Sequence, residues 1–566
     1  MLGLTSISSP PAKNRSKPQS VAYNQDDSIQ TEQQYWALLS AADESTFQHE
    51  FEPGFLLLLD DHEKKNYSQL PSLAARKSFI VHYWKSRNPN PLLPENDRLL
   101  DHLRRCAYAR EQFAMVEPPY FDDRGKYHIK YGKPLQRLQD IGGLRRLPES
   151  RVMIDLNLYS VKENESWSYV NIAPNFVVHF VKDGQTFHEV PSLKDAIIGN
   201  QRRGLLVWYW GDLLKKRFWM SPAINETVTQ IEALETELVV RNRGRTVRLG
   251  SSGISDRQIV RRLLENLERA DYAASEASLD APATTYHAIN ALNKLSFSED
   301  IAQFRGPEGQ TRVEVTVRTP LKNYVDHLDS LTTDTVRIEY ACLLRDQSFD
   351  SLTGARLQRY FPVKSAALEN LPFAIGCMTM LTSPRESELA LQVKNEQNGE
   401  LGFSLQALKI RDFSGRDLMM SDIQFFAGVT NTNQRQVLPV FERQNVMVVP
   451  YPYEELRKSV SLFCYFELYN LQSAGLGREY TVTYKVSRNR GRQGIFKRLS
   501  SLWGGRKEVS MSMTDTQSII ADNANQLIAL DIRNLPAGAY RLEVIVSGIK
   551  NKITPASAQK DFMIID

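Results

Sequence analysis

The feature that most constrains this chain is an alternation of apolar and polar residues that starts near residue 310 and recurs to the C-terminus. Val313, Val315 and Val317 alternate with polar neighbours, and the same period of two returns further along the chain. Successive side chains of a strand point to opposite faces of a sheet, so this pattern predicts strands with one buried face. Two series of such strands predict two all-β immunoglobulin-like sandwich domains, over residues 310–435 and 436–566.

The first half of the chain has a different pattern. Apolar residues three and four positions apart predict helices, for example over residues 72–84, and the Asn and Pro residues at 88–91 predict a break after this helix. Apolar runs at residues 127–134 and 176–181 predict strands, and the Asp-Gly pair at 183–184 predicts a hairpin turn. This mixture indicates an α+β region.

These patterns divide the chain into five parts. Residues 1–30 are rich in Ser, Pro, Asn and Gln and predict a disordered tail. We expect an α+β domain over residues 31–200 and a mostly helical connecting region over residues 201–309. The fold class predicted for the whole chain is therefore multidomain, with an α+β N-terminal region followed by the two immunoglobulin-like sandwich domains.

Composition limits the partners and the compartment. The chain has 70 Lys and Arg against 66 Asp and Glu, a net charge of +4, whereas proteins that coat nucleic acid carry a strong basic excess. We therefore expect no nucleic-acid partner. No apolar run reaches the ~18–20 residues that span a bilayer, and the first 20 residues lack the pattern of a secretory signal. The sequence as written predicts a cytoplasmic product, unless an export signal precedes it.

The cysteines and histidines do not form the patterns of metal sites or disulfide frameworks. The four cysteines are widely spaced and include no CxxC pair, so each is expected to be a small apolar residue. His179 and His188 flank the predicted hairpin turn, and only Glu189 stands near them as a third ligand. Ordinary histidines are the favoured interpretation, and we predict no metal. The chain also lacks HExxH, GxSxG, Walker A and GxGxxG motifs, and we predict no cofactor.

Asp122, Asp123 and Arg124 form a charged group just before the predicted strand at residues 127–134. One hypothesis is a catalytic or cation-binding pair of carboxylates. The other is a turn that an aspartate caps, with Arg124 in a surface ion pair. The second is favoured, because a calcium site needs about six to eight oxygen ligands and the neighbouring sequence does not supply them.

Residues 485–507 are unusually basic, with eight Lys and Arg residues and no acidic residue. At ~100° per residue, the apolar side chains of residues 494–505 fall on one arc and the basic ones on the other. One hypothesis is a short interfacial helix that contacts an anionic membrane surface or a protein partner. The other is a hairpin loop that folds back onto its own domain. The candidate contact residues are Ile495, Phe496, Lys497, Arg498, Leu499, Leu502 and Trp503.

Several segments, taken in order, resemble the GWxTD-domain family of bacterial proteins. The similar segments are residues 79–91 and 94–96, 104–113, 123–126 and 131–134, 165–169, 304–309 and 465–471. The motif that gives the family its name departs from its pattern here. Gly, Trp and Thr are replaced by Pro119, Tyr120 and Asp122, while Asp123, Arg124 and Gly125 remain. A role of this motif in catalysis is therefore disfavoured, and a structural role is more tolerant of the changes.

The resemblance implies an exported or envelope-associated protein with β-sandwich modules at its C-terminus, and hence a location in the cell envelope or periplasm. Our leading hypothesis is a non-enzymatic structural or interaction protein, of scaffold or adhesion type, without catalytic residues. The alternative is a hydrolase of envelope polymers with its site in residues 120–190. A cleft where Asp122, Asp123, Arg124 and Tyr127 converge with His179 would distinguish the alternative.

Overall fold

The computed structural model of the chain describes residues 28–146, 152–154, 158–199, 203–241, 247–249, 254–286, 295–321, 335–362, 373–428, 441–443, 446–451, 455–458, 462–488, 511–549 and 553–565. The chain forms two compact units, Met1–Arg87 with Glu95–Ile289 and Asn88–Pro94 with Asn290–Asp566. The helices within the described ranges include none that is both long and apolar enough to cross a membrane.

The first unit begins with a series of helices. They are α1 (Ser28–Ala41), α2 (Glu44–Thr46), a π-helical turn at Phe47–Phe51, α3 (Glu52–Leu56), α4 (Asp61–Ser68), α5 (Leu73–Ser86), α6 (Asp97–Gln112) and α7 (Asp123–Tyr131). Side chains cap the starts of α2, α4, α5, α6 and α7. The side chain of Ser72 accepts a hydrogen bond from the amide of Ala75, and Asn96 caps α6 in the same way. The helix expected over residues 72–84 is confirmed as α5.

A four-stranded antiparallel sheet follows, in the order β1 (Gln136–Asp140), β5 (Asn164–Ser168), β6 (Val177–Asp183) and β7 (Thr186–Val190). Residues 177–181 of β6 are buried on both faces of the sheet. Val178 and Phe180 join the core formed with α1–α7, whereas Val177 and Val181 join a second core. A strand that is buried on both faces of a sheet must pack against other elements on both sides, and the two cores show that this sheet does so.

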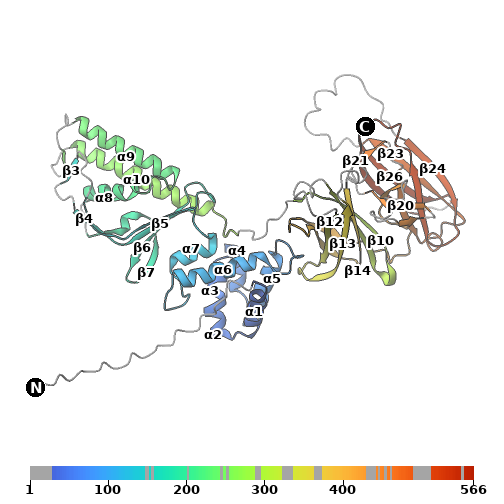
Figure 1. The fold of residues 1–566 in the computed structure, drawn as a ribbon, viewed down its shortest axis with the longest axis horizontal. Coiled ribbons are helices and arrows are strands. Elements are labelled where there is room, and N and C mark those ends of the chain that lie inside the picture. The colour runs from blue at the N-terminus through green and yellow to red at the C-terminus, as the bar shows by residue number, and fades with distance from the viewer. Residues whose placement is uncertain are drawn as a thin grey trace, which may run out of the picture. The chain divides into compact units, whose positions relative to one another are not determined.

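The cover on the second face comes from α8 (Arg203–Lys215), α9 (Pro222–Arg241) and α10 (Ile254–Asp280). Figure 1 shows α9 and α10 as two long helices beside each other next to this sheet. We expected residues 201–309 to be a connecting region; the structure instead packs the helices of this range onto the sheet. Smaller elements complete the unit: β2 (Gly143–Arg146), β4 (Leu158–Val161), β8 (Ile197–Ile198), β3 (Val152–Ile154), β9 (Val247–Leu249) and a 3-10 helix at Leu193–Ala196.

The second unit contains two pairs of sheets. In the first pair, β10 (Ser298–Arg305), β11 (Thr311–Pro320) and β14 (Phe373–Thr382) form one sheet. The other consists of β13 (Ser351–Pro362), β12 (Thr335–Arg345), β15 (Glu386–Asn395) and β16 (Leu401–Lys409). Side chains from both sheets share one buried core. The alternation near residue 313 is confirmed, because Val313, Val315 and Val317 are all buried in it.

The second pair has a core of its own, to which both of its sheets contribute. One sheet contains β17 (Met419–Met420), β22 (Leu462–Tyr469), β18 (Gln424–Gly428), β20 (Val446–Pro450), β19 (Phe441–Arg443) and β25 (Ala524–Leu530). The other contains β21 (Glu455–Arg457), β27 (Ala556–Ile565), β26 (Gly538–Gly548), β23 (Glu479–Arg488) and β24 (Met511–Ser518). The four cysteines are free, as the sequence predicts.

One predicted strand is wrong. Residues 127–134 were expected to be extended, but Asp123–Tyr131 form the helix α7. Asp122 caps the start of this helix, and Gly132, with φ of 74°, ends it. Tyr127 and Tyr131 lie one turn apart on the same side, with ring centroids separated by 6.0 Å. The two tyrosines are four positions apart, the spacing of neighbours on one face of a helix, and the segment is helical although its short apolar run resembles that of a strand.

Candidate functional site

The GWxTD-like motif lies in the turn that leads into α7. The amide of Tyr120 donates to the carbonyl of Glu117 at 2.9 Å, and the amide of Met115 donates to the carbonyl of Tyr120 at 3.1 Å. Tyr120 has a φ of 68°, an uncommon value for a residue other than glycine. The guanidinium of Arg110 lies 5.8 Å from the centroid of its ring. Pro119 and Tyr120 therefore shape a turn.

The two aspartates of the motif bind backbone amides. Asp122 accepts from the amide of Arg124 at 3.0 Å and from the amide of Phe187 in β7 at 3.2 Å. Asp123 accepts from the amide of Glu189, also in β7, at 2.8 Å. Asp122 is thus a helix N-cap, and both carboxylates fasten the start of α7 to the neighbouring strand. The expectation of an aspartate-capped turn is met, but the turn leads into a helix.

Arg124 was expected in a surface ion pair, and this is wrong. Its side chain is 12% exposed, and it pairs with Asp122 at 2.7 Å and with the fully buried Glu165 at 3.2 Å. Glu165 also accepts from Arg137 and, at 2.6 Å, from Nε1 of Trp167. Asp122, Arg124 and Glu165 therefore form a buried network, which Arg137 joins with a side chain that is 41% exposed, and the four charges sum to zero. Such a network stabilises only while every member keeps its partners.

Gly125, the last residue of the motif, faces the ring of Phe121. A Cβ at this position would lie 2.7 Å from the Cβ of Phe121, which is buried. We therefore expect Gly125→Ala to lower the free energy of unfolding by about 1–3 kcal/mol through overpacking. Chemical denaturation of the full chain, followed by the helical circular dichroism signal, measures this change.

Gly211 in α8 provides the matched control. A Cβ there meets only Ile231, at 3.5 Å, which is ordinary contact. Because alanine suits a helix interior better than glycine, Gly211→Ala is expected to raise the free energy of unfolding by about 0.5–1 kcal/mol. Stabilisation by both substitutions would contradict the proposed packing of Gly125.

His179 and His188 do not face each other, because in the β6–β7 register His179 pairs with Val190 and His188 with Val181. His179 is buried and its Nδ1 lies 2.8 Å from Oγ of Ser166. That hydroxyl oxygen in turn accepts from Nε of the fully buried Arg217 at 2.6 Å. Burial, together with the charge of Arg217, lowers the pKa of His179 to about 3. His179 is therefore neutral at physiological pH.

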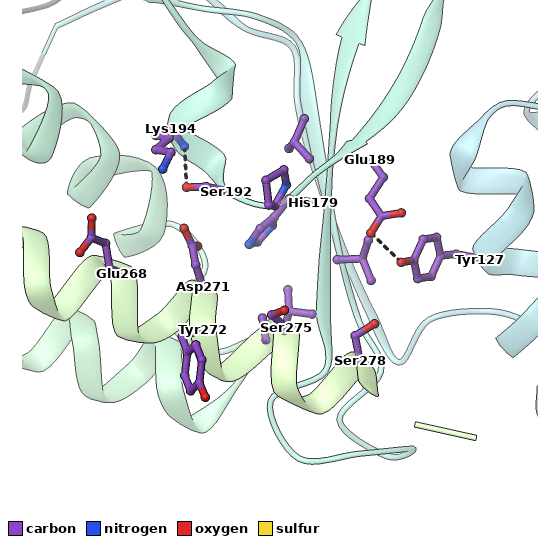
Figure 2. A pocket seen from close by; sticks show the side chains of 15 residues that line it. Tyr127, His179, Glu189, Ser192, Lys194, Glu268, Asp271, Tyr272, Ser275 and Ser278 are labelled. Carbon is purple, nitrogen blue, oxygen red and sulfur yellow. Dashed lines mark hydrogen bonds between the residues drawn. The ribbon is translucent and has the colours of Figure 1, made fainter. Parts of the chain in front are cut away.

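A cavity of about 380 Å³ lies between β6, β7 and α10 (Figure 2). Tyr127 and His179 line it, but Asp122, Asp123 and Arg124 do not, so this cavity in the described part of the chain differs from the cleft expected for the hydrolase alternative. The lining side chains are Tyr127, Val177, Val178, His179, Glu189, Val190, Pro191, Ser192, Lys194, Glu268, Asp271, Tyr272, Ala274, Ser275 and Ser278. Burial raises the pKa of Asp271 to about 7, despite a hydrogen bond from Ser192.

The sequence reasoning missed the contribution of α10 to this cavity. Glu268, Asp271, Ser275 and Ser278 recur at spacings of three and four, so they share one face of the helix. This polar stripe was the available signal. It could not be assigned to a site without knowing that α10 covers the sheet.

In the second unit, two segments of the family resemblance come together. The amide of Arg305 donates to the hydroxyl of Tyr469 at 2.9 Å, and its guanidinium donates to Oδ1 of Asn470 at 3.0 Å. The rings of Phe304 and Tyr465 lie 5.9 Å apart in a small buried cluster. Since β10 belongs to the first pair of sheets and β22 to the second, residues 304–309 and 465–471 join the two pairs.

Glu467 is the centre of this junction. It is 8% exposed, and its carboxylate accepts from Arg312 at 2.7 Å and from the hydroxyls of Tyr465 and Tyr469 at 2.8 Å each. Arg312 lies on β11 of the first pair. A buried carboxylate of the second pair of sheets is thus held by a guanidinium of the first.

The basic segment expected to contact a membrane or partner is described only at its start. Lys485 and Arg488 lie in β23. Residues 489–510, which include the amphipathic stretch 494–505, lie outside the described residues. Within the part of the chain that the structure covers, no cluster of three or more His, Cys, Asp or Glu residues has the geometry of a metal site.

Comparison with known proteins gives no family. No family model matches the chain. No curated protein matches it either. Among solved structures, trypsin-activated α2-macroglobulin from Escherichia coli aligns over 48% of this chain and 17% of its own, with 11% identity and a TM-score of 0.13. The chain therefore spans about a sixth of that protein, and this score does not establish a shared fold.

Proposed function

We propose that this protein is a non-enzymatic structural or interaction protein of the cell envelope, in which two immunoglobulin-like sandwiches act as a spacer or adhesion unit. The observation that carries this proposal is the junction around Glu467. Modules joined only by a flexible linker do not need a buried ion pair between them. Buried charged groups in some proteins specify one arrangement of the parts, and a spacer of fixed geometry needs such specificity.

The state of the GWxTD-like motif supports the non-enzymatic interpretation. A general acid or base needs a free carboxyl group within reach of a substrate. Asp122 and Asp123 instead bind backbone amides of β7, and Asp122 also pairs with Arg124. These contacts support a structural role for the motif. Such a role tolerates the replacement of its Gly, Trp and Thr in this chain better than a catalytic role would.

The envelope location rests on the resemblance to the GWxTD-domain family. The proposed contact with a protein partner or an anionic membrane surface rests on the amphipathic pattern of residues 494–505. Apolar residues on one side of such a segment enter the interface, and basic residues beside them meet anionic groups. Neither contact requires a cofactor.

Fractionation of cells that express the full chain tests this proposal. The protein is expected in the envelope fraction, protected from protease in intact cells and cleaved in spheroplasts.

The variant Leu499→Glu with Trp503→Glu is expected to keep its melting temperature but lose sedimentation with vesicles of anionic lipid or with the envelope. The control, Met513→Glu with Ile520→Glu, changes two exposed apolar residues outside the segment and is expected to sediment normally. Recovery of the unaltered protein as a free cytosolic species would overturn the proposal.

A further inference from the structure

The cavity beside α10 has the features of a ligand site and no part in the scaffold role proposed above. Its volume of about 380 Å³ is at the lower end of the range, roughly 300–1,000 Å³, of small-molecule sites. Val177, Val178, Val190 and Ala274 give it apolar walls, and polar groups stand at a few positions between them. Figure 2 shows His179 of β6 beside Asp271 of α10, with Lys194 of the 3-10 helix nearby and Glu189 of β7 turned toward Tyr127 of α7.

His179 presents a ring nitrogen to the cavity. Its side chain is 4% exposed, yet it lines the cavity. Arg217 always donates to Ser166, whose single hydroxyl proton is then available for Nδ1 of His179. When Ser166 donates to Nδ1, the ring proton lies on Nε2, which has no acceptor among the described residues. A ligand with an acceptor oxygen would satisfy this donor.

The charges around the cavity favour a cation. Three carboxyl groups, those of Glu189, Glu268 and Asp271, line it against the single ammonium of Lys194. Asp271 has lost most of its hydration, which is why its pKa is raised to about 7. A cation placed next to such a group stabilises its ionised form. Tyr127 and Tyr272 add ring faces, which also attract cations.

We propose that this cavity binds a small primary amine that also carries an acceptor oxygen, as amino alcohols and amino sugars do. The ammonium pairs with the carboxylate of Asp271, the apolar body lies against the valines, and the oxygen accepts from Nε2 of His179. An anionic ligand fits less well, because it would place a negative charge beside Asp271 and Glu189.

Binding is expected to depend on pH with a defined sign. The amine remains protonated below pH ~9, as alkyl ammonium groups do, so the change comes from Asp271. With a pKa of about 7, Asp271 is mostly protonated at pH 6 and mostly ionised at pH 8. The affinity for a cation should therefore rise about tenfold between these values. His179 remains neutral throughout, and Lys194, Asp195, Glu189 and Glu268 are the other charged groups near Asp271.

Ligand-observed NMR titration of the full chain tests this inference with a matched pair of probes, trans-2-aminocyclohexanol and trans-1,2-cyclohexanediol. We expect saturable binding of the amine, with an affinity at least about tenfold higher than that of the diol and the rise with pH given above. Equal affinities, tighter binding of the diol, or no saturable binding of the amine would overturn the inference. This comparison needs no variant.

Two variants locate the site. Asp271→Asn is nearly isosteric with the protonated side chain and is expected to fold, to lose the affinity for the amine about tenfold or more at pH 8, and to lose its pH dependence. Asp195→Asn removes a nearby negative charge that does not line the cavity, so it is expected to leave the affinity within about twofold. Unchanged affinity in Asp271→Asn, or equal losses in both variants, would show that the amine binds elsewhere.

Discussion

Replacement of Glu165 by alanine is expected to lower the free energy of unfolding of the N-terminal unit by about 1–3 kcal/mol. Glu165 is fully buried and accepts from Arg124, Arg137 and Trp167. Without it, Nε1 of the buried Trp167 loses its acceptor, while Asp122 still holds Arg124 and water hydrates Arg137, whose side chain is 41% exposed. A buried donor that is left without an acceptor costs about 1–3 kcal/mol, and this cost sets the size of the expected loss.

The measurement is chemical denaturation followed by the helical circular dichroism signal, because the described helices lie in this unit. Glu163→Ala is the matched control. Glu163 carries the same charge two residues away, but its own side chain is 25% exposed whereas Glu165 is fully buried, and removal of its pair with Lys182 is expected to cost about 0–1 kcal/mol. If the two variants lose the same stability, the network is not the structural centre that its burial indicates.

This expected result also bears on the hydrolase alternative. A carboxylate kept for catalysis is typically strained or poorly satisfied, so its removal often leaves stability unchanged or improved. Glu165 and Asp122 are instead held by hydrogen bonds and ion pairs on several sides. A large loss of stability from Glu165→Ala would therefore agree with the structural role proposed for this region.

The sequence predicted those parts of the fold that depend on local periodicity. Val313, Val315 and Val317 alternate with polar residues because only one face of β11 is buried, and the structure places all three in the core. The helix α5 could be predicted equally well, since Ser72 is the capping residue before its first turn. In both cases one short segment contains the whole signal.

The errors occurred where tertiary contacts decide the outcome. In α7, Tyr127 and Tyr131 fit a short strand or one helical face, and the contacts of Asp122 and Asp123 with β7 favour the helix. The apolar run of β6, interrupted by His179, was typical of a strand buried on both faces, and from it the helices of residues 203–280 could have been assigned to the sheet. The cavity could not be predicted, because His179 and Asp271 meet only after that packing.

Replacement of Glu467 by alanine is expected to separate the two pairs of sheets in the second unit. The substitution removes a buried carboxylate that accepts from Arg312 and from two tyrosine hydroxyls. Arg312 is 29% exposed and keeps Glu314 at 3.2 Å, so the loss comes mainly from the two hydroxyls, at about 1–3 kcal/mol each if the junction stays closed. Each pair of sheets has its own large core, so opening of the junction leaves both cores intact. The lower-energy response is therefore local opening of the junction, without unfolding of either pair.

Calorimetry and limited proteolysis distinguish this opening from general destabilisation. In the unaltered chain the two pairs of sheets are expected to unfold together, whereas Glu467→Ala should give two separate transitions and faster cleavage within residues 410–418, between β16 and β17. Glu543→Ala removes a partly exposed carboxylate of β26 outside the junction and should change neither result. A cooperative transition and unchanged cleavage in Glu467→Ala would mean that the apolar contact of Phe304 with Tyr465 suffices to hold the modules. In that case the fixed geometry of the proposed spacer would rest on packing, and the ion pair would not be its determinant.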